Sequence, residues 1–238
     1  EGDSLDPCLV EVPAGMKIQN ILSFFGNKNI LKEVKAVQAG GITGQILPFD
    51  RLDYPFDFSL RTHANTRLGS MLKVYNSHHC VVRTAANALK VSASEACGRC
   101  LTCRVGISRL IDLMEKITSG EGKDVDPELL KEVAAAVRDS SMCPLGAEAP
   151  IALLTSLKYF PEEYEAHLNG SCPAGRCPKL TDYLIREDQC TGCGDCQKVC
   201  PVHAIEGTEK NPRMIDPIQC IRCGRCPEVC PQGAIHYE

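Results

Sequence analysis

The residues of this chain that could do chemistry are mainly its cysteines, which are concentrated in short motifs. Sixteen cysteines occur in 238 residues. One motif occurs twice, as "CTGCGDCQKVCP" from Cys190 and as "CIRCGRCPEVCP" from Cys220. Each copy has the spacing C-x2-C-x2-C-x3-C-P, in which three thiolates reach irons of one cluster and the fourth cysteine binds the other cluster. The sequence therefore predicts two 4Fe-4S clusters.

The exchange of the fourth cysteine between the copies determines the expected ligand sets. Structural zinc sites are the alternative, but these usually pair two C-x2-C knuckles and would not account for the doubled motif with both prolines. The expected ligands of cluster 1 are Cys190, Cys193, Cys196 and Cys230, and those of cluster 2 are Cys220, Cys223, Cys226 and Cys200.

A third cysteine motif, "ACGRCLTCRVG", contains Cys97, Cys100 and Cys103. Three thiolates at this spacing reach three irons of a cubane, so the fourth ligand must come from elsewhere. Cys143 in "SSMCPLG" is the candidate, because the two helices expected before it can form a hairpin that returns the chain to Cys103. A radical-type cluster with an open iron is the alternative, but such sites usually need a barrel that this chain is too short to supply. We predict a third 4Fe-4S cluster, called the bundle cluster below.

The stretch "HLNGSCPAGRC" contains a different pattern, H-x4-C-x4-C, formed by His167, Cys172 and Cys177. A closed tetrahedral zinc site needs four ligands, so one more residue must come from a distant segment. Cys80 in "NSHHC" is the best candidate. The neighbouring His78 and His79 could replace it.

Other states of these cysteines remain open at this stage. Cys172 and Cys177 could form a disulfide, although reducing compartments disfavour one. They could also be free buried thiols or hold a binuclear iron-sulfur site. Cys8, near the start of the chain, is expected to be a small core residue on a strand.

Composition and charge exclude several classes of function. The net charge is -4 and there is no concentrated Lys/Arg face, which argues against nucleic acid as a partner. No apolar run approaches the roughly 18 residues of a membrane span, and the first residues of this sequence lack the basic n-region and apolar core that are typical of a signal peptide. Because C-x2-C runs suit metal centres better than disulfides, we expect a reducing, cytoplasmic location.

The elements that must position these residues change in character along the chain. Residues 1–76 are short and mixed, with a helix expected in "KIQNILSFFG" and a strand in "VKAVQAGG". Helical periodicity then predicts four helices, over residues 82–95, along "ISRLIDLMEKIT", along "DPELLKEVAAAVRD" with Asp126 as its N-cap, and from about Pro150 to before Pro161. The doubled motif, offset by 30 residues, follows.

The order of these motifs resembles the C-terminal part of the NADH-oxidising flavoprotein subunit of complex I-like oxidoreductases. The resemblance rests on "VKAVQAGG", "LDYPFDF", "EACGRCLTCRVG", the lone Cys143 and "SLKYF". With "CPAGRC" and the appended doubled motif, the chain is most similar to the beta subunit of electron-bifurcating NAD-dependent hydrogenases and related formate dehydrogenases.

The resemblance implies an α+β multidomain fold. It implies an SLBB domain of β-grasp fold over residues 1–76, a helical bundle with a 4Fe-4S cluster over 77–163, a linker with the zinc candidate over 164–182, and a two-cluster ferredoxin domain over 183–238. The flavin mononucleotide and NADH site of the family would lie on a preceding domain. That domain is absent from this sequence, since "AGGITG" lacks the G-x-G-x-x-G spacing.

We therefore expect a chain that transfers electrons through three 4Fe-4S clusters and has no catalytic NAD or flavin site of its own. The implied partners are other redox subunits of a hydrogenase- or formate dehydrogenase-like complex, among them a 2Fe-2S thioredoxin-like subunit, and also soluble ferredoxin. The alternatives are a ligand-binding or scaffold protein with structural or sensory clusters, and a freestanding ferredoxin-like carrier.

Overall fold

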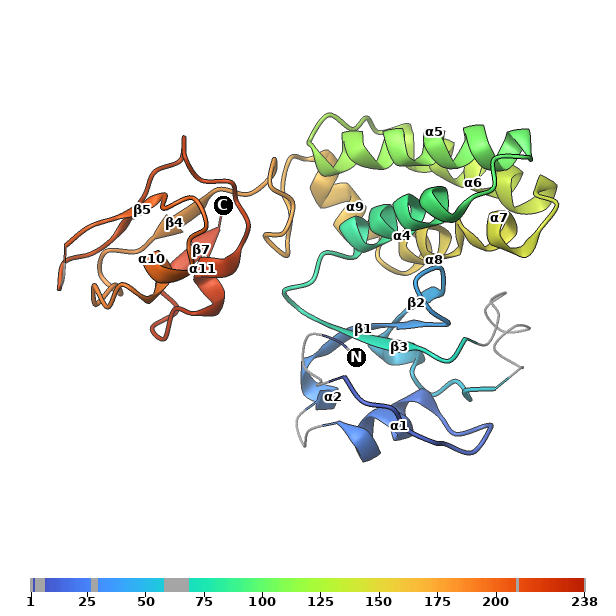
Figure 1. Ribbon diagram of the computed structural model, residues 1–238, viewed down its shortest axis with the longest axis horizontal. Helices are drawn as coiled ribbons and strands as arrows, with labels where there is room; N and C mark the ends of the chain where they lie inside the picture. Colours follow the sequence, from blue (N-terminus) through green and yellow to red (C-terminus); the bar gives the residue numbers. More distant parts are fainter. Residues whose placement is uncertain (1, 3–6, 27–29, 58–68, 209, 238) are drawn as a thin grey trace.

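The chain forms three regions that follow one another in sequence (Figure 1). The structure is a computed structural model that describes residues 2, 7–26, 30–57, 69–208 and 210–237. A small sheet region contacts a helical bundle, and a compact C-terminal region is attached to one end of that bundle through an extended segment (Figure 1). The coarse expectation of a mixed helix-and-sheet protein is confirmed, while the SLBB assignment stays a prediction.

The first region is built on a three-stranded antiparallel sheet of order β2-β1-β3. Its strands are β1 (Val34–Ala39), β2 (Gln45–Pro48) and β3 (Leu72–Asn76), and its helices are α1 (Ile18–Phe25), α2 (Ile30–Glu33) and η1 (Phe49–Arg51). Val37 and Leu47 pack with Ile18 of α1 on one face. Ala36 and Ile46 pack with bundle residues on the other. Because both faces are covered, β1 is buried almost throughout.

The bundle contains helices whose apolar residues recur with helical spacing. They are α4 (Val81–Glu95), α5 (Leu101–Thr118), α6 (Asp126–Ser140), α7 (Pro144–Glu148), α8 (Ile151–Tyr159) and α9 (Pro161–Leu168). The expected face of α5 is buried, with Ile107, Leu110 and Met114 at most 1% exposed. Gly106 lets α5 and α6 approach closely, since a Cβ there would lie 2.3 Å from Cγ2 of Val137. The predicted hairpin between Cys103 and Cys143 is therefore present.

The C-terminal region consists of two similar halves. The first half contains β4 (Tyr183–Ile185), α10 (Asp195–Val199) and β5 (Ile205–Glu206), and the second contains β6 (Met214–Ile215), α11 (Arg225–Glu228) and β7 (Ile235–Tyr237). Strand β4 pairs with β7, and β5 pairs with β6. Each two-stranded sheet thus joins one strand from each half, and the two halves are also expected to exchange their fourth cysteines.

Three local expectations differ from the structure. Residues 7–13 form no strand, and Cys8 is exposed rather than part of the core. Asp126 is the first residue of α6 instead of its N-cap, and its carboxylate accepts from Lys123 N at 2.7 Å. Helix α9 runs across the predicted boundary at residue 163, so His167 lies on the last bundle helix.

Within the described ranges, no helix combines the length and apolarity that crossing a membrane would require.

Candidate metal and cluster sites

The four residues predicted as zinc ligands come together at the end of the bundle that faces the C-terminal region. Cys80 is the residue before α4, His167 is on α9, and Cys172 and Cys177 are on the loop after it. Their ligand atoms all lie within 4.8 Å of one another, and all four side chains are buried. We call this cluster of four residues the joint site.

The distances in the joint site fit tetrahedral zinc. The sulfurs of Cys80 and Cys177 are 3.7 Å apart, and Nε2 of His167 lies 3.4 Å from Cys80 Sγ and 3.3 Å from Cys177 Sγ. Zn–S bonds of about 2.3 Å at tetrahedral angles place two sulfurs about 3.8 Å apart. The donor set and its spacing therefore suit a closed structural zinc site.

Neighbouring groups orient the ligands of the joint site. His167 donates from Nδ1 to the carbonyl oxygen of Glu163 at 2.6 Å, which leaves Nε2 directed at the sulfurs. Cys80 accepts from Arg83 N at 3.4 Å as the N-cap of α4, where the helix dipole favours a thiolate. Cys172 accepts from Arg176 N, also at 3.4 Å.

The protonation states of these side chains are coupled through their contacts. Hydrogen bonds from Cys177 and Cys80 lower the pKa of the Cys172 thiol strongly. The contact with Cys172 raises the pKa of Cys80 and raises that of Cys177 to about 12. Burial disfavours charge on His167, but the hydrogen bonds to Cys172 and Cys80 raise its pKa to about 10. Without a metal, these shifts favour a thiolate at Cys172 and protons on Cys80, Cys177 and His167.

The structure places Cys80 in the joint site, and it places the alternative ligands His78 and His79 outside that site. His79 stacks on Tyr75, with ring centroids 4.1 Å apart, and its Nε2 lies 2.7 Å from Thr84 Oγ1. His78 is outside the joint site, where its backbone oxygen accepts from Arg176 Nε. Cys172 and Cys177 are both free, so the disulfide alternative is not present in this structure.

One buried acidic residue that the sequence reasoning missed supports both sides of the joint site. Glu163 is 4% exposed, and its carboxylate accepts from Val81 N at 3.1 Å and pairs with Lys35 Nζ at 2.5 Å. Lys35 also donates to His79 O at 2.7 Å. The signal that could have found Glu163 is its position four residues before His167, on the same face of a helix.

The cysteines assigned to the bundle cluster gather at the opposite end of α4. Burial raises the pKa of Cys103, and Cys143, Cys100 and Cys97 lie close enough to Cys103 to raise it further. A Cβ on Gly146 would lie only 3.1 Å from Cys103 Sγ. Cys97 and Cys143 are exposed. This arrangement suits a 4Fe-4S cluster near the surface.

The eight cysteines of the C-terminal region line two separate cavities. One is lined by Cys190, Cys193, Cys196 and Cys230, and the other by Cys220, Cys223, Cys226 and Cys200. Each set combines three cysteines of one motif with the fourth cysteine of the other. The structure thus brings together the same sets that the motif spacing predicts.

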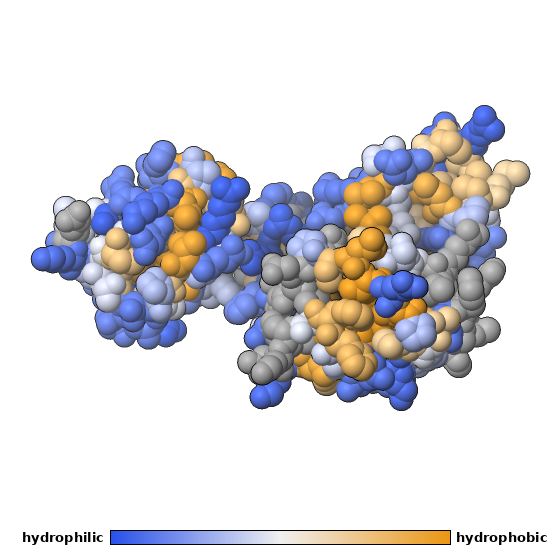
Figure 2. Space-filling view, turned by 60° about the horizontal axis from the view of Figure 1, so that its bottom comes forward, coloured by the Kyte–Doolittle hydropathy of each residue, from blue (hydrophilic) through white to orange (hydrophobic). Residues whose placement is uncertain are grey.

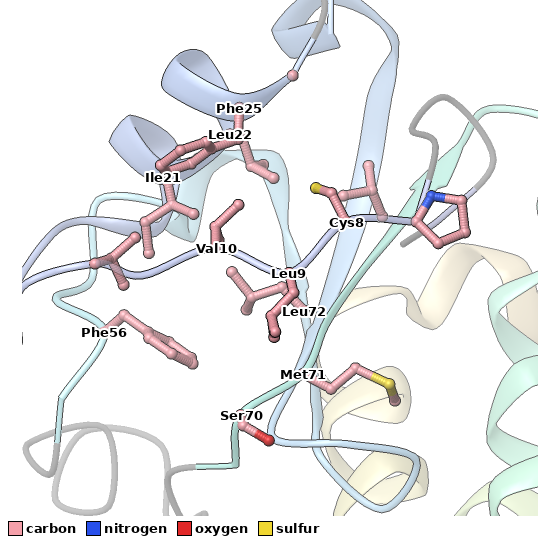
Figure 3. A pocket seen from close by; sticks show the side chains of 14 residues that line it. Cys8, Leu9, Val10, Ile21, Leu22, Phe25, Phe56, Ser70, Met71 and Leu72 are labelled. Atoms are coloured by element: carbon pink, nitrogen blue, oxygen red, sulfur yellow. The ribbon is translucent and has the colours of Figure 1, made fainter.

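The first region holds an apolar cavity of about 240 Å³ between its irregular N-terminal segment and the sheet. Figure 3 shows Leu9 and Val10 on one wall, between Phe25 of α1 and Leu72 of β3. Cys8 is the one cysteine among the residues that line it, and no acidic, basic or histidine side chain does so. Among the described residues, this cavity therefore has no acid-base or metal-binding set.

Two protein families match the middle and the end of the chain. Residues 83–167 match the iron-sulfur binding region of NADH-ubiquinone oxidoreductase F, and residues 181–234 match a 4Fe-4S dicluster domain. The bundle cysteines fall in the first match, and the eight C-terminal cysteines fall in the second. Residues 83–167, about a third of the chain, are therefore similar to that iron-sulfur binding region.

Several known proteins are similar to long stretches of this chain. The NADP-reducing hydrogenase subunit HndC of Solidesulfovibrio fructosivorans is 37% identical over 207 residues, which cover 86% of this chain and 42% of that protein. An NADH-quinone oxidoreductase subunit of Streptomyces coelicolor is 32% identical, over 72% of this chain and 39% of that protein. The sequence resemblance is thereby confirmed.

The fold is also similar to that of solved hydrogenase structures. An NAD+-reducing [NiFe]-hydrogenase in the H2-reduced state matches 70% of this chain with a TM-score of 0.62 and 27% identity, and the match covers 28% of the hydrogenase chain. The chain spans less than half the length of the curated relatives described above.

The joint site lies at the edges of these family regions. Cys80 precedes the oxidoreductase F match, whereas Cys172 and Cys177 fall between that match and the dicluster domain. His167 is the last residue of the oxidoreductase F match. The four residues therefore connect the two iron-sulfur regions.

Proposed function

We propose that this chain relays electrons through three 4Fe-4S clusters as part of a multi-subunit NAD(H)-linked oxidoreductase of hydrogenase or formate dehydrogenase type. The observation that carries the proposal is the gathering of twelve cysteines into three sets of four, within regions that match iron-sulfur families. Cysteine thiolates in fours are the usual ligands of a cubane. No general acid, base or nucleophile is needed for this function.

The chain's own residues would bind the clusters and set their potentials. Backbone N–H groups donate to cluster cysteines, as from Ala204 to Cys200 Sγ and from Ala234 to Cys230 Sγ, both at 3.3 Å. Hydrogen bonds to ligand sulfurs and the degree of burial tune the reduction potential. When bound, the clusters supply one-electron chemistry.

The flavin and the nicotinamide would bind elsewhere in the complex. The first region has an apolar surface against which a flavin-binding domain would pack. Leu9, Phe24 and Phe25 are between 44% and 100% exposed there. Figure 2 shows apolar residues gathered on the face of this region that comes forward in that view. Such a surface is typical of one that packs against further protein. We propose that the remainder of a longer chain, or a flavin-binding partner subunit, covers it.

The zinc candidate would act as a structural clip. Arg176, next to Cys177, donates from Nε to His78 O at 3.1 Å and from Nη2 to Glu228 Oε1 of α11 at 2.7 Å. Tyr237 Oη of β7 donates to Pro173 O at 2.8 Å. These contacts link the loop after α9 to the C-terminal region. A metal that fixes this loop would therefore fix the dicluster domain against the bundle.

The separation of the clusters favours two redox branches rather than one continuous line. Helix α4 has 15 residues and runs from the joint site toward Cys97, so about 22 Å of helix separates the two. The C-terminal region lies beyond the joint end of the bundle (Figure 1). Because electron tunnelling falls off exponentially with distance, we propose that a partner's centre, rather than direct transfer, connects the bundle cluster to clusters 1 and 2.

Metal analysis and redox titration of anaerobically purified protein test the proposal together. We expect about 12 irons from three cubanes and about one zinc per chain. All the iron should be in centres that are reduced reversibly at low potential. Iron for only two cubanes would contradict the bundle cluster, and full iron without zinc would contradict the metal at the joint site. Clusters that cannot be reduced would favour the scaffold alternative.

A further inference from the structure

The two halves of the C-terminal region differ in charge at one matched, buried position. Arg213 and Tyr183 both stand seven residues before the first cysteine of a motif. Arg213 lines the cavity of cluster 1, whereas Tyr183 lines that of cluster 2. We infer that the buried guanidinium of Arg213 gives cluster 1 a higher reduction potential than cluster 2, so that electrons in this region pass from cluster 2 to cluster 1. The inference rests on the proposed clusters.

The fold makes a specific place for the Arg213 side chain. The residue is 6% exposed, and its Nη1 donates to Gln197 Oε1 at 2.9 Å and to Gly207 O. A Cβ on Gly194 would lie 3.0 Å from Nη2, and a Cβ on Gly207 would lie 2.8 Å from Cδ. Two glycines therefore leave the space that the guanidinium fills. Its backbone N donates to Cys190 Sγ at 3.5 Å, which holds it beside cluster 1.

The charge of Arg213 is not balanced by nearby carboxylates. Its acceptors, Gln197 and the carbonyls of Gly207 and Gly192, are all neutral. Within the described part of the chain, no carboxylate lies at ion-pair distance, and Nε has no hydrogen-bond partner. A cubane with its thiolates becomes one charge more negative on reduction, so a buried cation beside it favours the reduced state.

The matched position next to cluster 2 is neutral. A Cβ on Gly224, the counterpart of Gly194, would lie 2.8 Å from Tyr183 Oη. Arg176 is also close to Gly224, but it pairs with Glu228 at 2.7 Å. Arg225 lines the cavity but is exposed, so solvent and salt screen its charge.

Hydrogen bonds to the exchanged cysteines do not produce the asymmetry. Ala204 N donates to Cys200 of cluster 2 and Ala234 N donates to Cys230 of cluster 1 at the same distance, 3.3 Å. Among the described residues, the exchange of Arg213 for Tyr183 is therefore a buried charge difference between the two cavities that these hydrogen bonds do not offset.

The difference in potential gives electron transfer a direction, away from the joint site. Tyr183, beside cluster 2, donates from Oη to Gly175 O in the loop between Cys172 and Cys177. Cluster 2 is thus the centre next to the joint site, and cluster 1 is the outer one. In the transfer, cluster 2 loses one electron and cluster 1 gains it, with no proton moved and no bond formed or broken. Electrons would therefore accumulate on the outer cluster, from which a partner takes them.

The test is a redox titration of the full chain, followed by EPR, on Arg213→Gln. At the wild-type midpoint potential of cluster 1, we expect the ratio of reduced to oxidised cluster to fall at least about tenfold, which is 59 mV for one electron. Only one centre should move, and Cys193→Ser should perturb the EPR signal of that same centre. Arg213→Lys keeps the charge and should keep most of the potential.

Two further variants keep the test decisive if Arg213→Gln assembles poorly. Gln197→Glu leaves Arg213 in place but sets a carboxylate against Nη1, and it should lower the same potential. Arg225→Gln removes an exposed charge beside cluster 2 and should shift its potential much less.

Three results would overturn the inference: an unchanged potential in fully loaded Arg213→Gln, an equal loss in Arg213→Lys, or an equal shift in Arg225→Gln. A wild-type chain without the two cubanes would instead contradict the proposed function.

Discussion

The joint site and the bundle cluster site lie at opposite ends of the same helix, α4, and they differ in exposure. In the joint site, Cys80, Cys172, Cys177 and His167 are each at most 2% exposed. In the bundle cluster site, Cys97 and Cys143 are exposed. A closed, buried donor set suits a structural metal, whereas ligands at the surface suit a centre that exchanges electrons with a partner. The two ends of α4 thus differ in the way that a structural metal site and an electron-transfer centre would differ.

The largest effect should follow from breaking the joint site alone. In Cys177→Ser, we expect the zinc content to fall from about one per chain to none, because structural zinc sites rely on all four ligands. Iron should stay at its full value, and the loop between the bundle and the C-terminal region should become sensitive to limited proteolysis. Cys8→Ser is the matched control and should retain both metals. Zinc that stays fully bound in Cys177→Ser would show that the metal is held elsewhere.

Replacing Cys143 should remove iron from the bundle cluster alone. In Cys143→Ser, iron should fall by about four per chain, or the site should keep a three-iron cluster with its own EPR signal. Zinc should not change, because the joint site is at the other end of α4. Iron that remains complete, with an unaltered spectrum, would mean that Cys143 is not the fourth ligand.

A distinct pH dependence should separate the two sites further. Since the metal-free joint site holds protons on His167, Cys80 and Cys177 at pH 7, zinc must displace about three protons on binding. Zinc affinity should then rise about a thousandfold per pH unit near neutrality. Both effects can be measured by calorimetry in buffers of different ionisation enthalpy. Release of one proton or fewer would contradict the assigned protonation states.

A smaller effect should follow from changing Glu163, which contacts the segments that carry the ligands of the joint site. Glu163→Gln removes the charge that pairs with Lys35 while keeping the shape of the side chain. We expect zinc to leave about 10- to 100-fold faster, as is typical when a group supporting the ligands is changed. Zinc release can be followed with a chromogenic chelator. Glu162→Gln, the exposed neighbour on α9, is the control, and equal rates in the two variants would contradict a role for Glu163.

Sequence spacing could reveal the clusters because their ligands are local. Each motif supplies three cysteines within seven residues, so only Cys143 and the exchanged Cys200 and Cys230 required an argument about the fold. The joint site was harder, because Cys80 lies 87 residues from His167 and only packing brings them together. Its choice over His78 and His79 rested on position along the chain.

Other features could not be predicted from the sequence, for physical reasons. Glu163, Lys35 and Arg213 act through burial and through contacts between distant segments, which leave little local pattern. Cys8 was expected in a strand because its neighbours are β-forming, but a strand needs a partner. Residues 7–13 have no such pairing in the sheet β2-β1-β3, and the prolines at both ends, Pro7 and Pro13, cannot donate to one.

The order of the joint ligands along the chain has a consequence for biosynthesis. All four, from Cys80 to Cys177, precede Cys190, the first cysteine of the doubled motif. During translation, all four residues of the joint site therefore leave the ribosome before any of the last eight cysteines does. Zinc captured at that moment would occupy its own thiolates first. The cluster assembly machinery would then meet eight cysteines already held apart from the rest, which reduces the chance of mismatched ligands.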